Sequence, residues 1–309
     1  MALTAFSTSN AYATAVKNYV DGITSVPDEW RRFSEFSTEQ SGALRMTSMA
    51  SIGEVASWDG TADLNSTATA AGAAATKTVD ITQYGSQVTI SRLDAETIPN
   101  LVGGMARRIG VAVANTYSKQ VFTTLNNCLS SETSGDGKAF FATNHTVPGN
   151  DSISDRTNLV ESAVDIAGIA AALKAARQWI DSTGAPYDLS AGGYWLVCSP
   201  SVEEAAMQAV MSPYTLTDIT TSGSPSQGLS NMVTQYLSVS DIIVSPHISD
   251  TNAAFLLPKL QPALMVWQRL APVLRTTQNE DDLSIRLTVD FALTAACQVE
   301  PIGIALNPS

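Results

Sequence analysis

The sequence has few basic residues, and they are not clustered. Its 309 residues include 17 Lys and Arg against 29 Asp and Glu, which gives a net charge of -12. The adjacent basic pairs are Arg31–Arg32 and Arg107–Arg108. Proteins that hold nucleic acid through its phosphates need clustered Lys and Arg side chains. We therefore predict no sequence-specific binding of nucleic acid.

Long apolar runs are also missing. No uninterrupted apolar stretch reaches the roughly 18 residues that a membrane-spanning helix requires. The first seven residues have neither the basic nor the apolar segment of a signal peptide, so we expect synthesis in the cytoplasm. The cysteines are odd in number and far apart, which favours buried free thiols in a reducing compartment: Cys128, Cys198 and Cys297.

Histidine is scarce as well, which limits the catalytic and metal sites that can exist. Only His145 and His247 occur, and neither has a second ligand at the spacing of a zinc site. His145 lies near Ser134 and Asp136, which suggests a hydrolase, but the Gly-x-Ser-x-Gly motif is absent. We predict no enzyme, no cofactor and no metal, and keep a soluble hydrolase using His145 as the least favoured alternative.

One long helix dominates the sequence pattern, and we expect it to span residues 99–127. Pro99 suits its first turn, and Ser91 with Asp94 predicts a cap on a short turn before it. Gly103, Gly104 and Gly110 predict a bend or the close approach of another backbone. The apolar positions recur every three or four residues and predict one buried stripe: Ile98, Val102, Met105, Ile109, Val113, Tyr117, Val121 and Leu125.

The segments before this helix have little continuous apolar pattern. Residues 1–50 indicate an arm with a brief helix at Asn10–Val20, and its aromatic residues favour docking on another surface. The alternative is a subdomain that closes its own core. Residues 51–90 indicate a protruding hairpin with strand-like alternation after residue 78. Aromatic and basic side chains of these segments are our candidates for inter-subunit contacts: Trp30, Phe33, Phe36, Trp58, Lys77 and Tyr84.

The rest of the chain mixes helices and strands. A helix is expected at Ser162–Ser182, and a second begins at Pro200 with Glu203 and Glu204 near its positive end. Residues 214–232 predict a flexible loop. Alternating or continuous apolar residues predict strands at Tyr194–Cys198, Ser240–Val244, Ala253–Leu257, Ala263–Gln268, Leu283–Leu293 and Ile302–Leu306.

This order of elements resembles the Hong Kong 97-type capsid fold of tailed phages. Ile90-Ser-Arg-Leu-Asp94 before the long helix, and Asp136-Gly-Lys-Ala-Phe-Phe141 followed by His145, resemble the Mu-like prophage major head subunit family. The resemblance implies an α+β fold with an N-terminal arm at 1–50 and an extended loop at 51–90. It also implies a peripheral domain at 91–159 and 271–309, which carries the spine helix, and an axial α/β domain at 160–270.

The resemblance further implies a structural role in a virion. Copies of the chain would form the hexamers and pentamers of an icosahedral shell around double-stranded DNA. A separate scaffolding protein, a maturation protease and a portal are the partners that the family implies. Lys77 could form a covalent cross-link between subunits, although an ordinary exposed lysine is favoured. A cargo-enclosing nanocompartment of the encapsulin type is the main alternative function.

Overall fold

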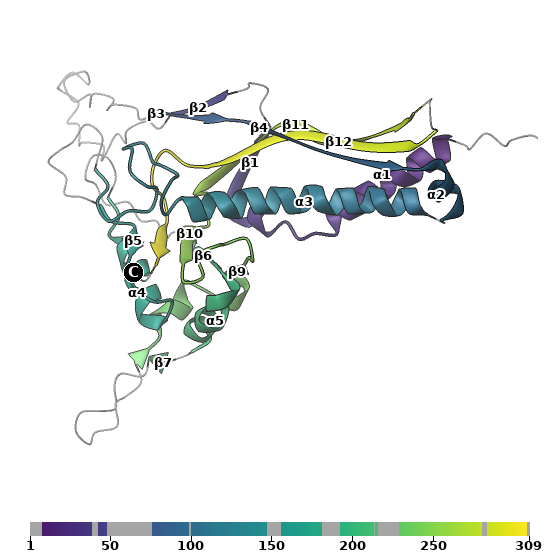
Figure 1. The fold of residues 1–309 in the computed structure, drawn as a ribbon. Helices are drawn as coiled ribbons and strands as arrows, with labels where there is room; N and C mark the ends of the chain where they lie inside the picture. The colour runs from purple at the N-terminus through teal and green to yellow at the C-terminus, as the bar shows by residue number, and fades with distance from the viewer. Residues whose placement is uncertain are drawn as a thin grey trace, which may run out of the picture.

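The described residues form a long, narrow part and a shorter part beside one end of it (Figure 1). They have two large hydrophobic cores and one small cluster around Met46 and Trp267. The first core follows the long part and continues onto the sheet of the shorter part, and the second lies within the shorter part. The computed structural model describes residues 8–38, 43–47, 76–98, 100–146, 156–180, 192–212, 214–215, 229–279 and 283–307. Mixed helices and strands make up both parts, so the fold class is α+β as predicted.

The predicted spine helix is present as α3 (Leu101–Asn127). A short helix, α2 (Arg92–Thr97), precedes it, and the Ser91 hydroxyl accepts a hydrogen bond from the Asp94 N–H at 3.1 Å, as the capping pattern predicts. α3 begins two residues later than residue 99, because Asn100 has a left-handed backbone (φ 59°) that separates the two helices. The stripe predicted along α3 is buried from its middle to its end: Ile109, Val113, Tyr117, Val121 and Leu125.

The first helix, α1 (Thr8–Thr24), is longer than the predicted brief helix and packs along α3. At the contact, a Cβ on Gly110 would lie 2.2 Å from the Tyr19 carbonyl oxygen, and one on Gly103 would lie 2.4 Å from Asn18 Nδ2. Gly110 therefore marks the close approach of another backbone, as predicted, whereas Gly103 faces side chains of α1. Gly104 faces no such neighbour, since nothing lies within 4 Å of the corresponding position.

The long part contains a four-stranded sheet with the order β1-β11-β12-β4. Its strands are β1 (Ser34–Thr38), β4 (Thr82–Ile90), β11 (Leu264–Gln278) and β12 (Ile285–Cys297). The strand predicted at 263–268 was too short, because β11 shifts register between Gln268 and Val273 and these irregularities break the alternation. Alternate residues of β12 face the core, as predicted: Leu287, Val289, Phe291 and Leu293.

The shorter part is a five-stranded sheet with two helices packed on it. The strand order is β5-β13-β10-β6-β9, and the predicted strand Tyr194–Cys198 is present with the same bounds as β6. The other elements are β5 (Leu159–Val160), β9 (Ile242–Val244), β10 (Ala254–Pro258), β13 (Ile304–Leu306), α4 (Ile166–Arg177) and α5 (Glu203–Met211). α4 starts later than predicted, because Asp165 caps it by accepting a hydrogen bond from the Gly168 N–H at 2.7 Å.

Two small hairpins complete the described elements. Strands β2 (Ala43–Thr47) and β3 (Thr76–Asp80) pair at the base of the predicted extended loop. β7 (Tyr214–Thr215) pairs with β8 (Leu229–Ser230), and most of the loop predicted at 214–232 lies outside the described residues. Short 3-10 turns lie at Glu29–Arg32, Pro200–Val202, Met232–Gln235 and Val239–Asp241.

The sequence also predicted buried free cysteines and no membrane-spanning helix. The three cysteines are free and buried, as predicted. None of the helices in the described ranges has the length and apolarity needed to cross a bilayer.

Candidate inter-subunit surfaces

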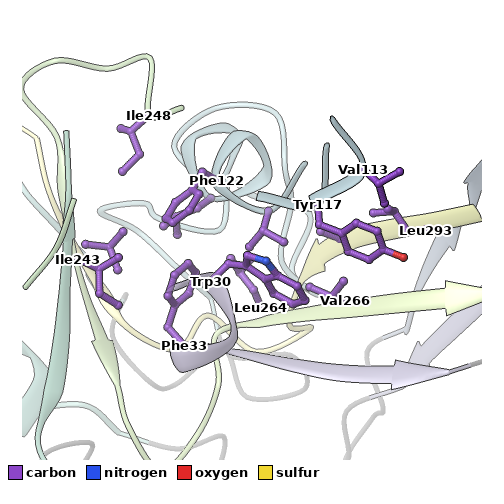
Figure 2. Packing of buried hydrophobic residues seen from close by; sticks show 14 of the residues in the cluster. Trp30, Phe33, Val113, Tyr117, Phe122, Ile243, Ile248, Leu264, Val266 and Leu293 are labelled. Carbon is purple, nitrogen blue, oxygen red and sulfur yellow. The ribbon is translucent and has the colours of Figure 1, made fainter. Parts of the chain in front are cut away.

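Two of the aromatic residues assigned to inter-subunit contacts belong instead to the chain's own core. Trp30 is 3% exposed and Phe33 is 2% exposed. Trp30 stacks on Tyr117 with ring centroids 6.0 Å apart, and Phe33 contacts Phe122 at 5.5 Å. Figure 2 shows both rings beside the spine helix. Side chains this deeply buried have almost no surface to offer a second copy. The arm therefore docks on another surface, as expected, but that surface is the spine helix of its own chain, and the alternative of a subdomain that closes its own core does not describe these two residues.

The turn that carries Trp30 also fastens the arm to the shorter part. The Arg32 guanidinium lies over the Trp195 ring of β6 at 4.2 Å and donates a hydrogen bond to the Ser240 carbonyl at 2.5 Å. The Lys259 ammonium lies 4.5 Å from the centroid of the same ring, so two cations contact Trp195. The Arg31 guanidinium lies 5.1 Å from the Trp30 centroid. Both arginines of this basic pair therefore make contacts within the chain.

Tyr84 and Phe36 are partly buried against the first core. Tyr84 stacks on Phe291 with ring centroids 5.4 Å apart, and its hydroxyl donates a hydrogen bond to Gln120 Oε1 at 2.9 Å. Phe291 in turn stacks on Tyr117 at 5.5 Å. These rings link the sheet to the spine helix inside one chain. The remaining aromatic candidate lies outside the described residues: Trp58.

Lys77 is not the exposed lysine that the sequence favoured. It lies on β3, and its side chain is 14% exposed. The ammonium contacts Glu132 Oε2 at 2.8 Å, the Thr133 carbonyl at 3.0 Å and Cys297 Sγ at 3.1 Å. Burial alone would lower the pKa of Lys77, but the attraction of Cys297 and the hydrogen bond to Glu132 raise it. This contact fastens the base of the extended loop to the body of the same chain.

Ser134, Asp136 and His145 do lie together, but not as a catalytic triad. Asp136 Oδ2 is 2.8 Å from His145 Nδ1, and the Ser134 hydroxyl donates to Asp136 Oδ1 at 2.5 Å. A triad needs the serine and the carboxylate on opposite nitrogens of the ring. Here Ser134 is also on the Nδ1 side, at 3.5 Å, and His145 is completely buried. The arrangement is that of a structural, hydrogen-bonded histidine.

Three of the exposed apolar side chains that sequence reasoning missed lie on α2 or beside it, while others, such as Met211 and Leu260, are exposed elsewhere. Leu93 is 73% exposed, Ile98 is 47% exposed and Leu283 is 37% exposed. Ile285 pairs with Ile90, which places Leu283 beside the start of α2. We call Leu93, Ile98 and Leu283 the distal patch. The apolar spacing predicted burial for Ile98 and Leu283, but each lies just beyond the end of its helix or strand.

Backbone strain and an uncharged sheet edge adjoin the distal patch. Leu283 has φ 56°, a left-handed conformation that is unfavourable for a leucine. β4 forms one edge of the four-stranded sheet, and its residues Thr82–Ile90 include no charged side chain. Sheet edges of soluble proteins are usually protected by charge, proline or a covering segment. This end of the molecule therefore has the features of a surface that a further chain covers.

Comparisons with solved structures find capsid proteins. The cyanophage P-SCSP1u capsid has 14% identity and a TM-score of 0.56, covering 90% of this chain and 87% of that chain. The procapsid of bacteriophage JBD30 has 13% identity and a TM-score of 0.54, and the match covers 99% of this chain and 77% of that chain. A virus-like particle from Pyrococcus furiosus has 11% identity and a TM-score of 0.55, covering 95% and 98%. At these identities the likeness establishes the Hong Kong 97-type fold.

The family comparison goes further than the fold. A comparison with curated proteins finds no match. The family described as phage capsid protein matches residues 73–307, which is most of the chain. This match favours a phage shell over a nanocompartment, and the role of the family is structural. The chain belongs to the phage capsid protein family, as a major capsid protein of a phage shell.

Proposed function

We propose that copies of this chain assemble into the hexamers and pentamers of a closed icosahedral head of a Mu-like phage. The match to the phage capsid protein family over residues 73–307 carries the proposal. The Mu-like assignment is supported by the sequence around Asp136 and His145, where the family pattern recurs. Closed symmetric shells suit a chain of this kind, because each repeated contact can be modest while the whole shell is stable.

The distal patch is our candidate for the contact between neighbouring copies. Leu93 projects from α2 with most of its surface exposed, and the uncharged edge of β4 directly precedes α2. Covering these groups with a neighbouring subunit would remove apolar area from water and pair the edge of β4, which no described strand pairs. The earlier candidates Lys77 and Tyr84 then have an indirect role, since they hold the extended loop and the sheet in position.

The remaining assignments concern the partners of the shell. We propose that the head encloses double-stranded DNA without reading its sequence, since the chain is acidic overall. A scaffolding protein, a maturation protease and a portal would act during assembly in the cytoplasm of a bacterial host. The domain limits at 1–50, 51–90, 91–159 with 271–309, and 160–270 belong to the same proposal, with two adjustments: β11 joins the sheet of the long part from Leu264 on, and β13 joins the sheet of the shorter part. Loop 214–232 would face the axis of each hexamer or pentamer.

Sedimentation of the purified protein, with negative-stain microscopy of the fractions, tests assembly. We expect shells, rings or curved sheets from the wild-type chain. Leu93→Glu should leave the subunit folded, because the side chain is exposed, and should abolish the large species. Leu93→Met is the matched control and should assemble normally. A wild-type protein that stays monomeric even with a co-expressed scaffold would refute assembly, and normal shells from Leu93→Glu would refute this contact.

A further inference from the structure

Both ring nitrogens of His145 face hydrogen-bond acceptors. Nδ1 lies 2.8 Å from the Asp136 carboxylate oxygen Oδ2. Nε2 lies 3.1 Å from the Phe140 carbonyl oxygen and 3.1 Å from Asn158 Oδ1. The ring is completely buried, so bulk water does not reach either nitrogen. A neutral imidazole has one N–H and one lone pair, and the lone pair would then point at an acceptor.

The orientation of the Asn158 amide is fixed by its other contacts. The Ala142 N–H donates to Asn158 Oδ1 at 2.9 Å, and Asn158 Nδ2 donates to the Phe140 carbonyl at 2.9 Å. Rotating the amide by half a turn would place its NH₂ group against the Ala142 N–H and its oxygen against the Phe140 carbonyl. Both changes lose a hydrogen bond in a buried site. Asn158 therefore offers an acceptor, not a donor, to His145.

The carboxylate on the other side of the ring is held in its charged form. Asp136 accepts hydrogen bonds from the Ser134 hydroxyl and the Lys138 N–H on one oxygen and from the Thr146 N–H on the other. Burial alone would raise the pKa of Asp136, but the hydrogen bonds from His145, Ser134 and Lys138 outweigh it and hold this pKa far below its usual range.

We propose that His145 is bound as the doubly protonated imidazolium and forms a buried ion pair with Asp136. Each N–H then has an acceptor, and the two opposite charges compensate each other. Among the described residues of the adjoining segments, two cations lie nearby and point elsewhere. The Lys138 ammonium donates to the Asn144 carbonyl, and the Arg156 guanidinium lies over Trp179 and donates to the Ile180 carbonyl.

The ion pair lies where the two parts of the molecule join, so its loss would affect their connection. The Phe141 N–H donates to the Cys128 carbonyl at the end of α3. On the other side, the Ala305 N–H of β13 donates to the Asn158 carbonyl. Removing the second proton from His145 would leave a lone pair facing two acceptors. The segments 132–146 and 156–158 thus form a proton-dependent latch between the spine helix and the second sheet.

Nitrogen-15 NMR of protein labelled at histidine tests this directly, in subunits or in assembled shells. The chain has only two histidines, and the variant His247→Gln assigns the signals. At neutral pH we expect both ring nitrogens of His145 to give signals of protonated nitrogen. In Asp136→Asn, which removes the counter-charge, one of them should change to that of a non-protonated nitrogen. A non-protonated signal for His145 in the wild-type protein would overturn the proposal.

A second measurement tests the latch through its counter-charge. The unfolding midpoint should fall in both His145→Gln and Asp136→Asn, and a double-mutant cycle of the two substitutions should show coupling, because removing either group leaves the other without its partner. Additive losses from the two substitutions would contradict the latch. Because neither measurement depends on shell formation, failure of the assembly proposal would leave both results interpretable.

Discussion

The contact between α1 and α3 gives the sharpest test of where the N-terminal arm lies. Replacing Gly110 by alanine would place a Cβ 2.2 Å from the Tyr19 carbonyl oxygen and 3.0 Å from the Ile23 backbone nitrogen. Both atoms belong to the backbone of α1, so no side-chain rotation can relieve the overlap. The two helices would have to separate, or α1 would leave α3.

The expected magnitude follows from two opposing terms. Alanine is favoured over glycine in a helix interior by about 1 kcal/mol. Forcing an extra carbon into a packed contact costs about 1–3 kcal/mol, and the backbone atoms at Gly110 favour the upper end. Gly104 lies on the same helix with nothing within 4 Å of its Cβ position, so Gly104→Ala has only the favourable term. The two variants should therefore differ in the free energy of unfolding by about 2–3 kcal/mol.

Urea unfolding of unassembled subunits, followed by circular dichroism, measures this difference. Limited proteolysis within α1 supplies an independent readout, since a displaced helix is cleaved sooner. We expect Gly104→Ala to be more stable than the wild type and Gly110→Ala to be less stable, with faster cleavage of α1. Equal stabilisation by both substitutions would refute the reasoning, because it would show that α1 does not pack on α3 of its own chain.

The remaining predictions concern polar contacts of the first core. Lys77→Met should lower the free energy of unfolding by about 1–3 kcal/mol, because it leaves the partly buried Glu132 without its cation. In a double-mutant cycle, adding Glu132→Gln to Lys77→Met should cause little further loss of unfolding free energy. The pKa of Asp136 is lower in the folded chain than in the unfolded one. The ionised carboxylate therefore contributes stability above about pH 4, and this contribution is lost as the pH falls below that value. Asp136→Asn should flatten the acid side of the curve of unfolding free energy against pH. Tyr84→Phe should cost about 0.5–1.5 kcal/mol in urea unfolding, since it leaves Gln120 without its donor.

Several elements followed directly from the sequence. The three-and-four spacing from Ile109 to Leu125 predicted the buried stripe of α3, and strict alternation predicted the core face of β12. Ser91 caps α2 where the pattern placed it. These features are local: a helix or strand presents residues at a fixed period, whatever it packs against. The order of these elements, together with the segment from Asp136 to His145, also indicated the capsid family.

Other features required the tertiary structure, because they depend on which distant segments meet. Trp30 and Phe33 look the same in sequence whether they dock on a neighbour or on their own spine helix, and the fold decided for the latter. Lys77 acquired its partners from residues more than fifty positions away. Leu283 continued an apolar alternation, yet it lies before the start of β12 and is exposed. Periodicity thus determined which residues share a face, while only the packed chain decided what that face contacts.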